Sequence, residues 1–344
     1  MESTSPTSNI KLGNIRRKSI NLSPTQLVKV GLLPSRKIPL VIQPAVEGLN
    51  LVKWAQDNQD FIEKNLLQHR ALLFRGFNIN TSDLFNQFVS TTSSGQLLEY
   101  RDRSSPRHEI SNKIYTSTDY PADQSIYLHN EGTYWLTYPL KIYFCCLVVA
   151  EQGGETPIAD CRQVFERISP QTRQKFIDKN ILYVRNYNDG FGLTWQTVFQ
   201  TEDKAVVEEY CNKNAIEYEW KTGDRLRTRS YRQAIAKHPI TGELSWFNHA
   251  AFFHVSTLEP SLQEALLAEF KQEDLPNNTY YGNGSQIEPE ILAEIRTAYQ
   301  QEKIMFPWEQ GDLLMLDNLS VAHSRTPFIG KRKVVVAMTD PVKK

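Results

Sequence analysis

The sequence predicts a mainly β protein with helical insertions, in which an antiparallel jelly-roll barrel supplies the core. Many short apolar segments are separated by glycine turns, a pattern typical of antiparallel β architectures. Segments with helical periodicity interrupt them, mostly between residues 160 and 300. The chain has 344 residues, is 40% hydrophobic and shows no internal repeat or low-complexity linker. We therefore expect one large domain over residues 38–340.

The N-terminal 37 residues differ from the rest. They are rich in Ser, Thr, Asn and Pro and carry seven Lys or Arg against one acid, Glu2. This composition predicts a flexible N-terminal arm, with a transit peptide as the alternative. Order is expected to begin near Ile38.

Each later element has its own signal. Apolar residues near one face predict helices over 49–68 and 82–90. The run 71–77, closed by a glycine, and the run 139–150 read as strands, the latter too apolar to be half-exposed. Asp160 is a candidate N-cap, and Ser169 followed by Pro170 marks another helix start. The remaining expected elements are a strand at 181–187, a helix at 202–214, strands around Gly223 and Gly242 within 215–254, helices at 260–271 and 288–302, and strands at 312–317 and 332–338.

Composition excludes several classes of function. Lys plus Arg and Asp plus Glu both number 39, so no global field favours nucleic acid or an acidic membrane surface. The four cysteines form no C-x-x-C pair, and buried free thiols fit a reducing cytoplasm. There is no run of 18 apolar residues and no secretory signal, so we expect no membrane span and a cytoplasmic location.

The chemistry is organised around the stretch LHNEGT at residues 128–133. On a strand, residues i and i+2 share a face, so His129 and Glu131 can reach one metal ion together. The triplet alone is weak evidence, and a third ligand is needed. His323, downstream in LDNLSVAHSR, is the best candidate. Two histidines and one carboxylate on one face of Fe(II) leave positions open for substrate and oxygen.

Other interpretations of these residues stay open. Two His and one Glu also make a catalytic zinc site, although the helical H-E-x-x-H spacing is absent. His238, His249 and His254 are expected in the core or at the surface, with His254 the one most able to line a pocket.

An iron site of this type needs electrons, and a bound 2-oxo acid is a common source. The distal carboxylate of such a cosubstrate needs a fixed cation, for which the planar fork of Arg is suited. Arg332 follows a turn nine positions after His323, and Arg325 lies two positions after it. Thr156 is the candidate hydroxyl donor. Arg332, Arg325 and Thr156 are therefore the predicted cosubstrate residues.

Several stretches resemble the taurine dioxygenase (TauD/TfdA) type of Fe(II)/2-oxoglutarate oxygenases, within it the branch typified by the syringomycin-pathway oxygenase SyrP. They occur in the family's order over residues 38–340, namely IYTSTDYPADQSIYLHNE (114–131), GGETPIADCR (153–162), GFGLTWQTVFQT (190–201), YYGNGSQI (280–287) and FPWEQGDLLMLDNLSVAHSRTPFIGKRKVVVAM (306–338).

The resemblance implies a double-stranded β-helix, or cupin-like jelly roll. It implies iron on His129, Glu131 and His323, and 2-oxoglutarate on Arg332 and Thr156, with O2 as the other cosubstrate. One departure is visible: the family's His-Gly-Arg reads His-Ser-Arg here, which leaves the role of Arg325 open. Halogenases of the superfamily lack the carboxylate, so Glu131 favours hydroxylation over chlorination.

The expected reaction is hydroxylation of an unactivated C–H bond, with release of succinate and CO2. The expected substrate is a small amino-acid-like molecule of specialised metabolism, free or tethered to a carrier protein. Desaturation or cyclisation by the same oxidant, a zinc hydrolase, and a non-catalytic binding protein are the alternatives. Arg103, Arg227, Arg229 and Trp195 are candidate substrate contacts, but residues of these types are more often surface ion pairs or core aromatics.

Overall fold

The computed structural model describes residues 24–94, 97–98, 102, 109–111, 114–116, 120–188, 190 and 192–343. Its strands are β1 (Val28–Leu32), β2 (Leu40–Pro44), β3 (Ala71–Phe74), β4 (Glu109–Ser111), β5 (Ile114–Thr116), β6 (Ile126–His129), β7 (Thr137–Val148), β8 (Gln152–Gly153), β9 (Ile158–Asp160), β10 (Ile181–Tyr187), β11 (Ile216–Lys221), β12 (Arg225–Arg232), β13 (Ile235–Lys237), β14 (Leu244–Trp246), β15 (Asn277–Tyr281), β16 (Leu313–Asp317), β17 (Val321–Arg325), β18 (Phe328–Ile329) and β19 (Lys333–Lys343). Its helices are α1 (Pro24–Leu27), α2 (Leu51–Asp57), α3 (Gln59–His69), α4 (Ser82–Thr91), α5 (Cys161–Arg167), α6 (Pro170–Lys179), α7 (Trp195–Phe199), α8 (Lys204–Lys213), α9 (Pro260–Glu269) and α10 (Pro289–Glu302), with 3-10 turns η1 (Val255–Thr257) and η2 (Gln272–Asp274).

The jelly roll consists of a large and a small sheet. The large sheet has the order β1-β2-β3-β16-β7-β19-β5-β4, and only the β2–β3 pair in it is parallel. The small sheet has the order β6-β17-β9. The two sheets meet through side chains: the ring of Phe144 on β7 lies 4.9 Å from the ring of His323 on β17. The expected β-rich fold with helical insertions is confirmed.

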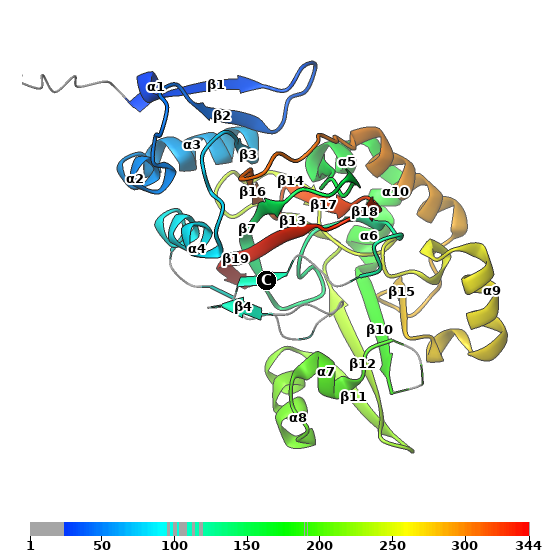
Figure 1. Cartoon of the computed structure of the whole chain (residues 1–344). Coiled ribbons are helices and arrows are strands. Elements are labelled where there is room, and N and C mark those ends of the chain that lie inside the picture. Colours follow the sequence, from blue (N-terminus) through cyan, green and yellow to red (C-terminus); the bar gives the residue numbers. More distant parts are fainter. Residues whose placement is uncertain are drawn as a thin grey trace, which may run out of the picture.

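The central strands β3, β16 and β7 of the large sheet are buried on both faces because helices cover the outer side of the sheet (Figure 1). Alternation along the strands sends Leu72 and Phe74 into one core with α2, α3 and α4. It sends Leu73 and Phe144 into the other core, which faces the small sheet, α5, α6 and α10. This two-sided burial explains the near-continuous apolar sequence of β3, β7 and β16.

The insertion between β9 and β16 forms a further sheet of its own, in the order β11-β12-β10-β15. Helices α7 and α8 lie beside it, drawn in light green in the lower part of Figure 1. The predicted turns at Gly223 and Gly242 separate β11 from β12 and β13 from β14. The chain then leaves strand geometry, and residues 247–254 form turns, in which Phe252 stacks on the predicted ligand His129.

Three expectations on the elements were wrong in detail. Order begins before Ile38, because β1 pairs along its length with β2. The predicted helix 49–68 is broken at Asn58, whose side chain donates to the Trp54 carbonyl and ends α2. The short strands β6, β8, β9, β17 and β18 were not predicted as separate elements. Residues 1–23 of the arm predicted over residues 1–37 lie outside the described residues.

The expected helix starts and the expected state of the cysteines are confirmed. Asp160 and Ser169 cap α5 and α6, with Pro170 at the first position of α6. All four cysteines are buried and free. Among the described residues, no helix is long and apolar enough to cross a membrane.

We expect Phe74→Ala to lower the free energy of unfolding by about 3–5 kcal/mol, because it empties a fully buried site. The Phe74 ring packs edge-on against Phe88 at 5.0 Å and Trp54 at 6.5 Å. Urea denaturation followed by circular dichroism measures the loss. Ile240→Ala, at a side chain that is 65% exposed, is the control and should change stability by less than about 0.5 kcal/mol. Equal effects of the two substitutions would contradict this packing.

Candidate metal centre

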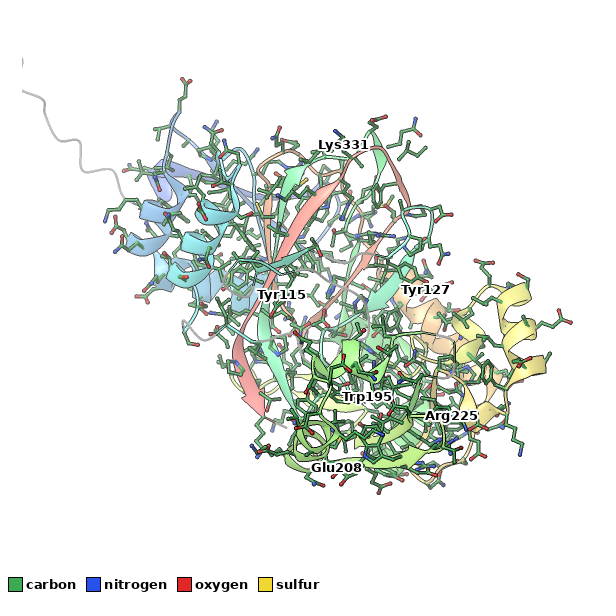
Figure 2. The ribbon with its side chains drawn as sticks, turned by 60° about the horizontal axis from the view of Figure 1, so that its bottom comes forward. Tyr115, Tyr127, Trp195, Glu208, Arg225 and Lys331 are labelled. Carbon is green, nitrogen blue, oxygen red and sulfur yellow. The ribbon has the colours of Figure 1, made fainter. Side chains whose placement is uncertain are left out.

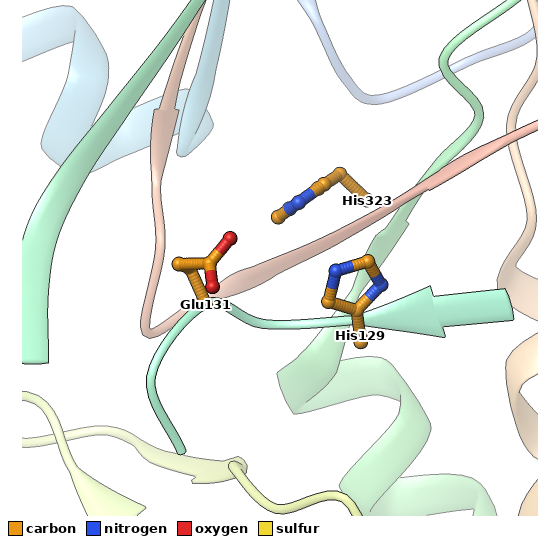
Figure 3. Close-up of side chains that lie close together, drawn as sticks. All are labelled: His129, Glu131 and His323. Atoms are coloured by element: carbon orange, nitrogen blue, oxygen red, sulfur yellow. The ribbon is translucent and has the colours of Figure 1, made fainter. Parts of the chain in front are cut away.

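The structure brings the three predicted ligands together. One ligand atom each from His129, Glu131 and His323 lies within 4.8 Å of the others, and all three residues are buried. Figure 3 shows the two imidazole rings and the carboxylate turned toward a common point. They come from β6, from the residues just after β6, and from β17, so the large separation along the sequence closes in space.

The two histidines are partners across one strand pair. In the antiparallel register of β6 and β17, His129 lies opposite His323, and their ring centroids are 4.5 Å apart. Directly opposed residues in such a pair project their side chains from the same face of the sheet. The register therefore places both rings on the inner face of the small sheet.

The tautomer of His129 is fixed by the backbone. Its Nδ1 donates to the Tyr127 carbonyl at 2.8 Å, because a carbonyl oxygen only accepts. Nδ1 thus carries the proton and Nε2 keeps its lone pair for a metal. Phe252 stacks on the same ring, with centroids 4.6 Å apart and planes within 5°. This hydrogen bond and the stacked Phe252 ring both help to fix the orientation of the imidazole.

Glu131 is placed in a different way from the one the sequence suggested. Strand β6 ends at His129, so Glu131 does not belong to the same strand. Instead Asn318, fully buried between β16 and β17, accepts a hydrogen bond from the Glu131 N–H at 2.8 Å. Its amide nitrogen donates to the carbonyls of Glu131 at 2.9 Å and of Pro139 at 2.8 Å. The Asn318 side chain, which lies just before the strand of His323, therefore holds the backbone of Glu131.

Asn130 and His249 complete the support of this turn. The Asn130 amide donates to the Asn318 carbonyl at 2.7 Å, and His249 Nε2 donates to the Asn130 carbonyl at 2.8 Å. Sequence reasoning missed Asn318 and Asn130 as site residues. The available signal was Asp317-Asn318, two polar residues directly after the apolar run LLML, which is an unusual place for buried polar groups.

Thr156 and Arg332 lie on neighbouring parts of the barrel. The Thr156 hydroxyl is buried and accepts from the Trp308 indole at 3.1 Å, so its own proton remains available to another acceptor. Arg332 donates through Nε to the Gly154 carbonyl at 2.8 Å. Burial, then the nearby Arg325, lower the pKa of Arg332, and a bound anion would offset both effects.

Arg325 has another set of contacts. Its Nη1 donates to the Tyr120 carbonyl at 2.9 Å, and its Nη2 donates to the carbonyls of Pro121 and Gln124 at 2.5 and 2.7 Å. Arg325 therefore holds residues 120–124 against β17, and a cosubstrate role for it stays a prediction. Ser324 sits in the extended β17 strand and donates to the Pro157 carbonyl, so the departure from Gly leaves the strand intact.

The residues weighed as substrate contacts are used elsewhere in the fold. Arg227 is paired with Asp274, and Arg229 with Glu219 at 3.4 Å. Trp195 is buried in the core of the insertion. His238 is buried and donates to Asp317 at 2.7 Å. Arg103 lies outside the described residues.

Comparison with known proteins agrees with this geometry. The family model for the taurine catabolism dioxygenase TauD, TfdA family matches residues 35–338. The chain belongs to this family. It is thus a 2-oxoglutarate-dependent dioxygenase that uses Fe(II) as its metal cofactor and 2-oxoglutarate and O2 as cosubstrates.

Individual relatives cover most of the chain. The dapdiamide synthesis protein DdaC of Enterobacter agglomerans is 43% identical over 82% of this chain and 85% of its own length. A clavaminate synthase-like protein of Arabidopsis thaliana is 27% identical over 89% and 91%. The crystal structure of PvcB from Pseudomonas aeruginosa aligns with a TM-score of 0.54 at 15% identity, over 95% and 94% of the two chains. That structural likeness supports the fold.

We expect Asn318→Ala to weaken Fe(II) binding about 10–100-fold, because the backbone of Glu131 loses its two hydrogen bonds to the Asn318 side chain. Anaerobic titration with Fe(II), read by calorimetry, measures the change. Asn58→Ala is the matched control, since it removes a buried asparagine that bonds only within the outer helices. Equal iron affinity in the wild type and Asn318→Ala would show that Asn318 does not position Glu131.

Proposed function

We propose that this dioxygenase hydroxylates an unactivated C–H bond of a small amino-acid-like molecule in specialised metabolism, with the substrate free or carried on a protein. The observation that carries the proposal is the buried His129, Glu131 and His323 set, whose ligand atoms lie within 4.8 Å of one another. The likeness to a dapdiamide synthesis protein supports the metabolic setting.

In this proposal the three ligands hold Fe(II) on one side. The iron, with 2-oxoglutarate, supplies the oxidising chemistry when bound. The chain's part is orientation and exclusion of water. His129 is fixed by Tyr127 and Phe252, and the ring of Phe144 closes the large-sheet side of His323. Glu131 supplies a carboxylate where a halogenase would need an open position, which favours hydroxylation over chlorination.

Arg332 and Thr156 are proposed to bind the distal carboxylate of 2-oxoglutarate. Arg332 supplies the charge and Thr156 the hydroxyl proton that Trp308 leaves available. The Phe328 ring lies 5.6 Å from the Arg332 guanidinium and covers it. A desolvated cation beside a second arginine favours a dianionic ligand over a neutral one.

Desaturation and cyclisation need the same residues and are distinguished by product analysis. A zinc hydrolase uses the same donor set, and metal dependence separates it from the proposal. Full activity with zinc and without 2-oxoglutarate would favour the hydrolase.

The test is anaerobic absorption spectroscopy on adding Fe(II) and then 2-oxoglutarate. We expect a weak visible charge-transfer band that requires both additions, because the 2-oxo acid chelates the ferrous ion. The band should be absent in His129→Ala, Glu131→Ala and His323→Ala, with circular dichroism confirming that each variant is folded. A wild type that binds one iron per chain and shows no band would overturn the proposal.

Arg332→Met should raise the KM for 2-oxoglutarate about 10–100-fold, the loss of one charge-assisted hydrogen-bonded contact. Arg332→Lys keeps the charge but lacks the planar fork, so its KM should lie between those of Arg332→Met and the wild type. Succinate formation measures the effect. Lys331→Met, at the exposed neighbouring cation, is the control and should leave the KM unchanged. An unchanged KM in Arg332→Met would remove Arg332 from the cosubstrate site.

A further inference from the structure

Arg296 on α10 is a half-buried cation whose hydrogen bonds, within the described residues, go to the hydroxyls of Ser256 and Thr257. We propose that Arg296, with His254 and Tyr127, binds an anionic group of the substrate, a carboxylate or a phosphate, beside the metal centre. This inference rests on the proposed function, since it names a chemical feature of the same substrate.

The contacts of Arg296 leave its charge unbalanced. Its Nη2 donates to Ser256 Oγ at 2.5 Å and Thr257 Oγ1 at 3.2 Å. It pairs with no carboxylate in the part of the chain that the structure describes, whereas the buried Arg185 bonds Asp102 at 2.5 Å. A guanidinium withdrawn from water without a counter-ion is costly, and burial lowers its pKa accordingly. A bound anion would remove that cost.

His254 adds a donor to the same place. Its Nδ1 accepts from the Ser256 N–H at 3.1 Å, so Nδ1 is unprotonated and the neutral ring carries its proton on Nε2. Burial and the charge of Arg296 lower the pKa of His254 to about 4, which keeps the ring neutral at physiological pH. Nε2 makes no hydrogen bond within the described residues.

Tyr127 is the outer member of the cluster. Its side chain is 42% exposed and it interacts electrostatically with Arg296. Figure 2 places the labelled Tyr127 beside the orange helix, α10. Tyr127 precedes His129 by two positions on β6, and its carbonyl accepts from His129 Nδ1. A ligand that reaches Arg296 past the exposed Tyr127 ring would therefore lie beside the strand that carries His129.

The cluster is joined to the metal centre by direct contacts. Thr257, which accepts from Arg296, donates to the Ala251 carbonyl. The next residue, Phe252, stacks on the ring of His129. On the other side, the Tyr127 carbonyl holds the Nδ1 proton of His129. Substrate anchored at Arg296 would thus be positioned by the segments that orient the metal ligand.

The donors define the ligand class. A guanidinium fork, an imidazole N–H and a phenol O–H match an acceptor with several oxygens. A carboxylate would come from a free amino acid, and a phosphate from the pantetheine arm of a carrier protein. The alternative is that Arg296 only ties α10 to η1, which predicts lost stability without lost anion preference.

The test uses the enzyme loaded anaerobically with Fe(II) and saturating 2-oxoglutarate. Three probes are titrated by calorimetry and by their effect on the charge-transfer band: N-acetylglycine, the neutral N-acetylglycinamide and methyl phosphate. We expect one anionic probe to bind at least tenfold more tightly than the amide and to shift the band. The anion that binds more tightly identifies the source: N-acetylglycine indicates a free amino acid, and methyl phosphate indicates a carrier protein.

Arg296→Gln should abolish the preference for the anion, and Arg296→Lys should keep part of it. Arg173→Gln, at an arginine already paired with Glu166, is the matched control. If Arg296→Gln fails to fold, the anion preference is measured in Arg296→Lys and His254→Asn instead. Anion preference unchanged in the variants, or no binding of either anion to the wild type, would overturn the inference. A missing band in the wild type would instead mean that the proposed function has failed.

Discussion

The site depends on the pairing of β6 with β17 and on the asparagine at the start of that pairing. His129 and His323 are opposite partners, so a shift of one residue would turn one ring to the outer face of the small sheet. Asn318 then joins the Glu131 backbone to the strand that carries His323. The buried Asn318 amide makes its hydrogen bonds inside the protein and so couples Glu131 to the two histidines.

The large sheet makes this pairing stable. β16 is hydrogen-bonded to β3 and β7, and both of its faces are buried. It ends at Asp317, whose carboxylate accepts from the N–H groups of Leu319 and Ser320 at 3.0 Å. The turn into β17 is thus fixed before His323 is reached. Helices α2, α3 and α4 cover the outer face, so that the inner face alone is left to build a site.

The sequence predicted the chemistry better than the geometry that supports it. The ligand types and their order were visible at His129, Glu131 and His323, as were buried strands, since an apolar run constrains burial strongly. The shared strand face of His129 and Glu131 was the wrong reason for a correct grouping, because β6 ends at His129. Asn318 was not found because its partners, Glu131 and Pro139, are about 180 positions away, and periodicity carries no information on such contacts. The short strand β17 was not predicted for the same reason, since its pairing with β6 and β9 defines it.

Net charge is a poor guide to what this protein binds. The 39 basic and 39 acidic residues cancel, yet the local balance is uneven around the barrel. Arg332 lies near both Arg325 and Glu155, and burial lowers its pKa. Arg296 donates to hydroxyls and lies beside a neutral imidazole. By contrast, Arg75 is paired with Asp312 at 2.6 Å. A buried guanidinium is costly unless an anion compensates it. These two partly buried arginines are consistent with a reaction in which both the cosubstrate and the substrate arrive as anions.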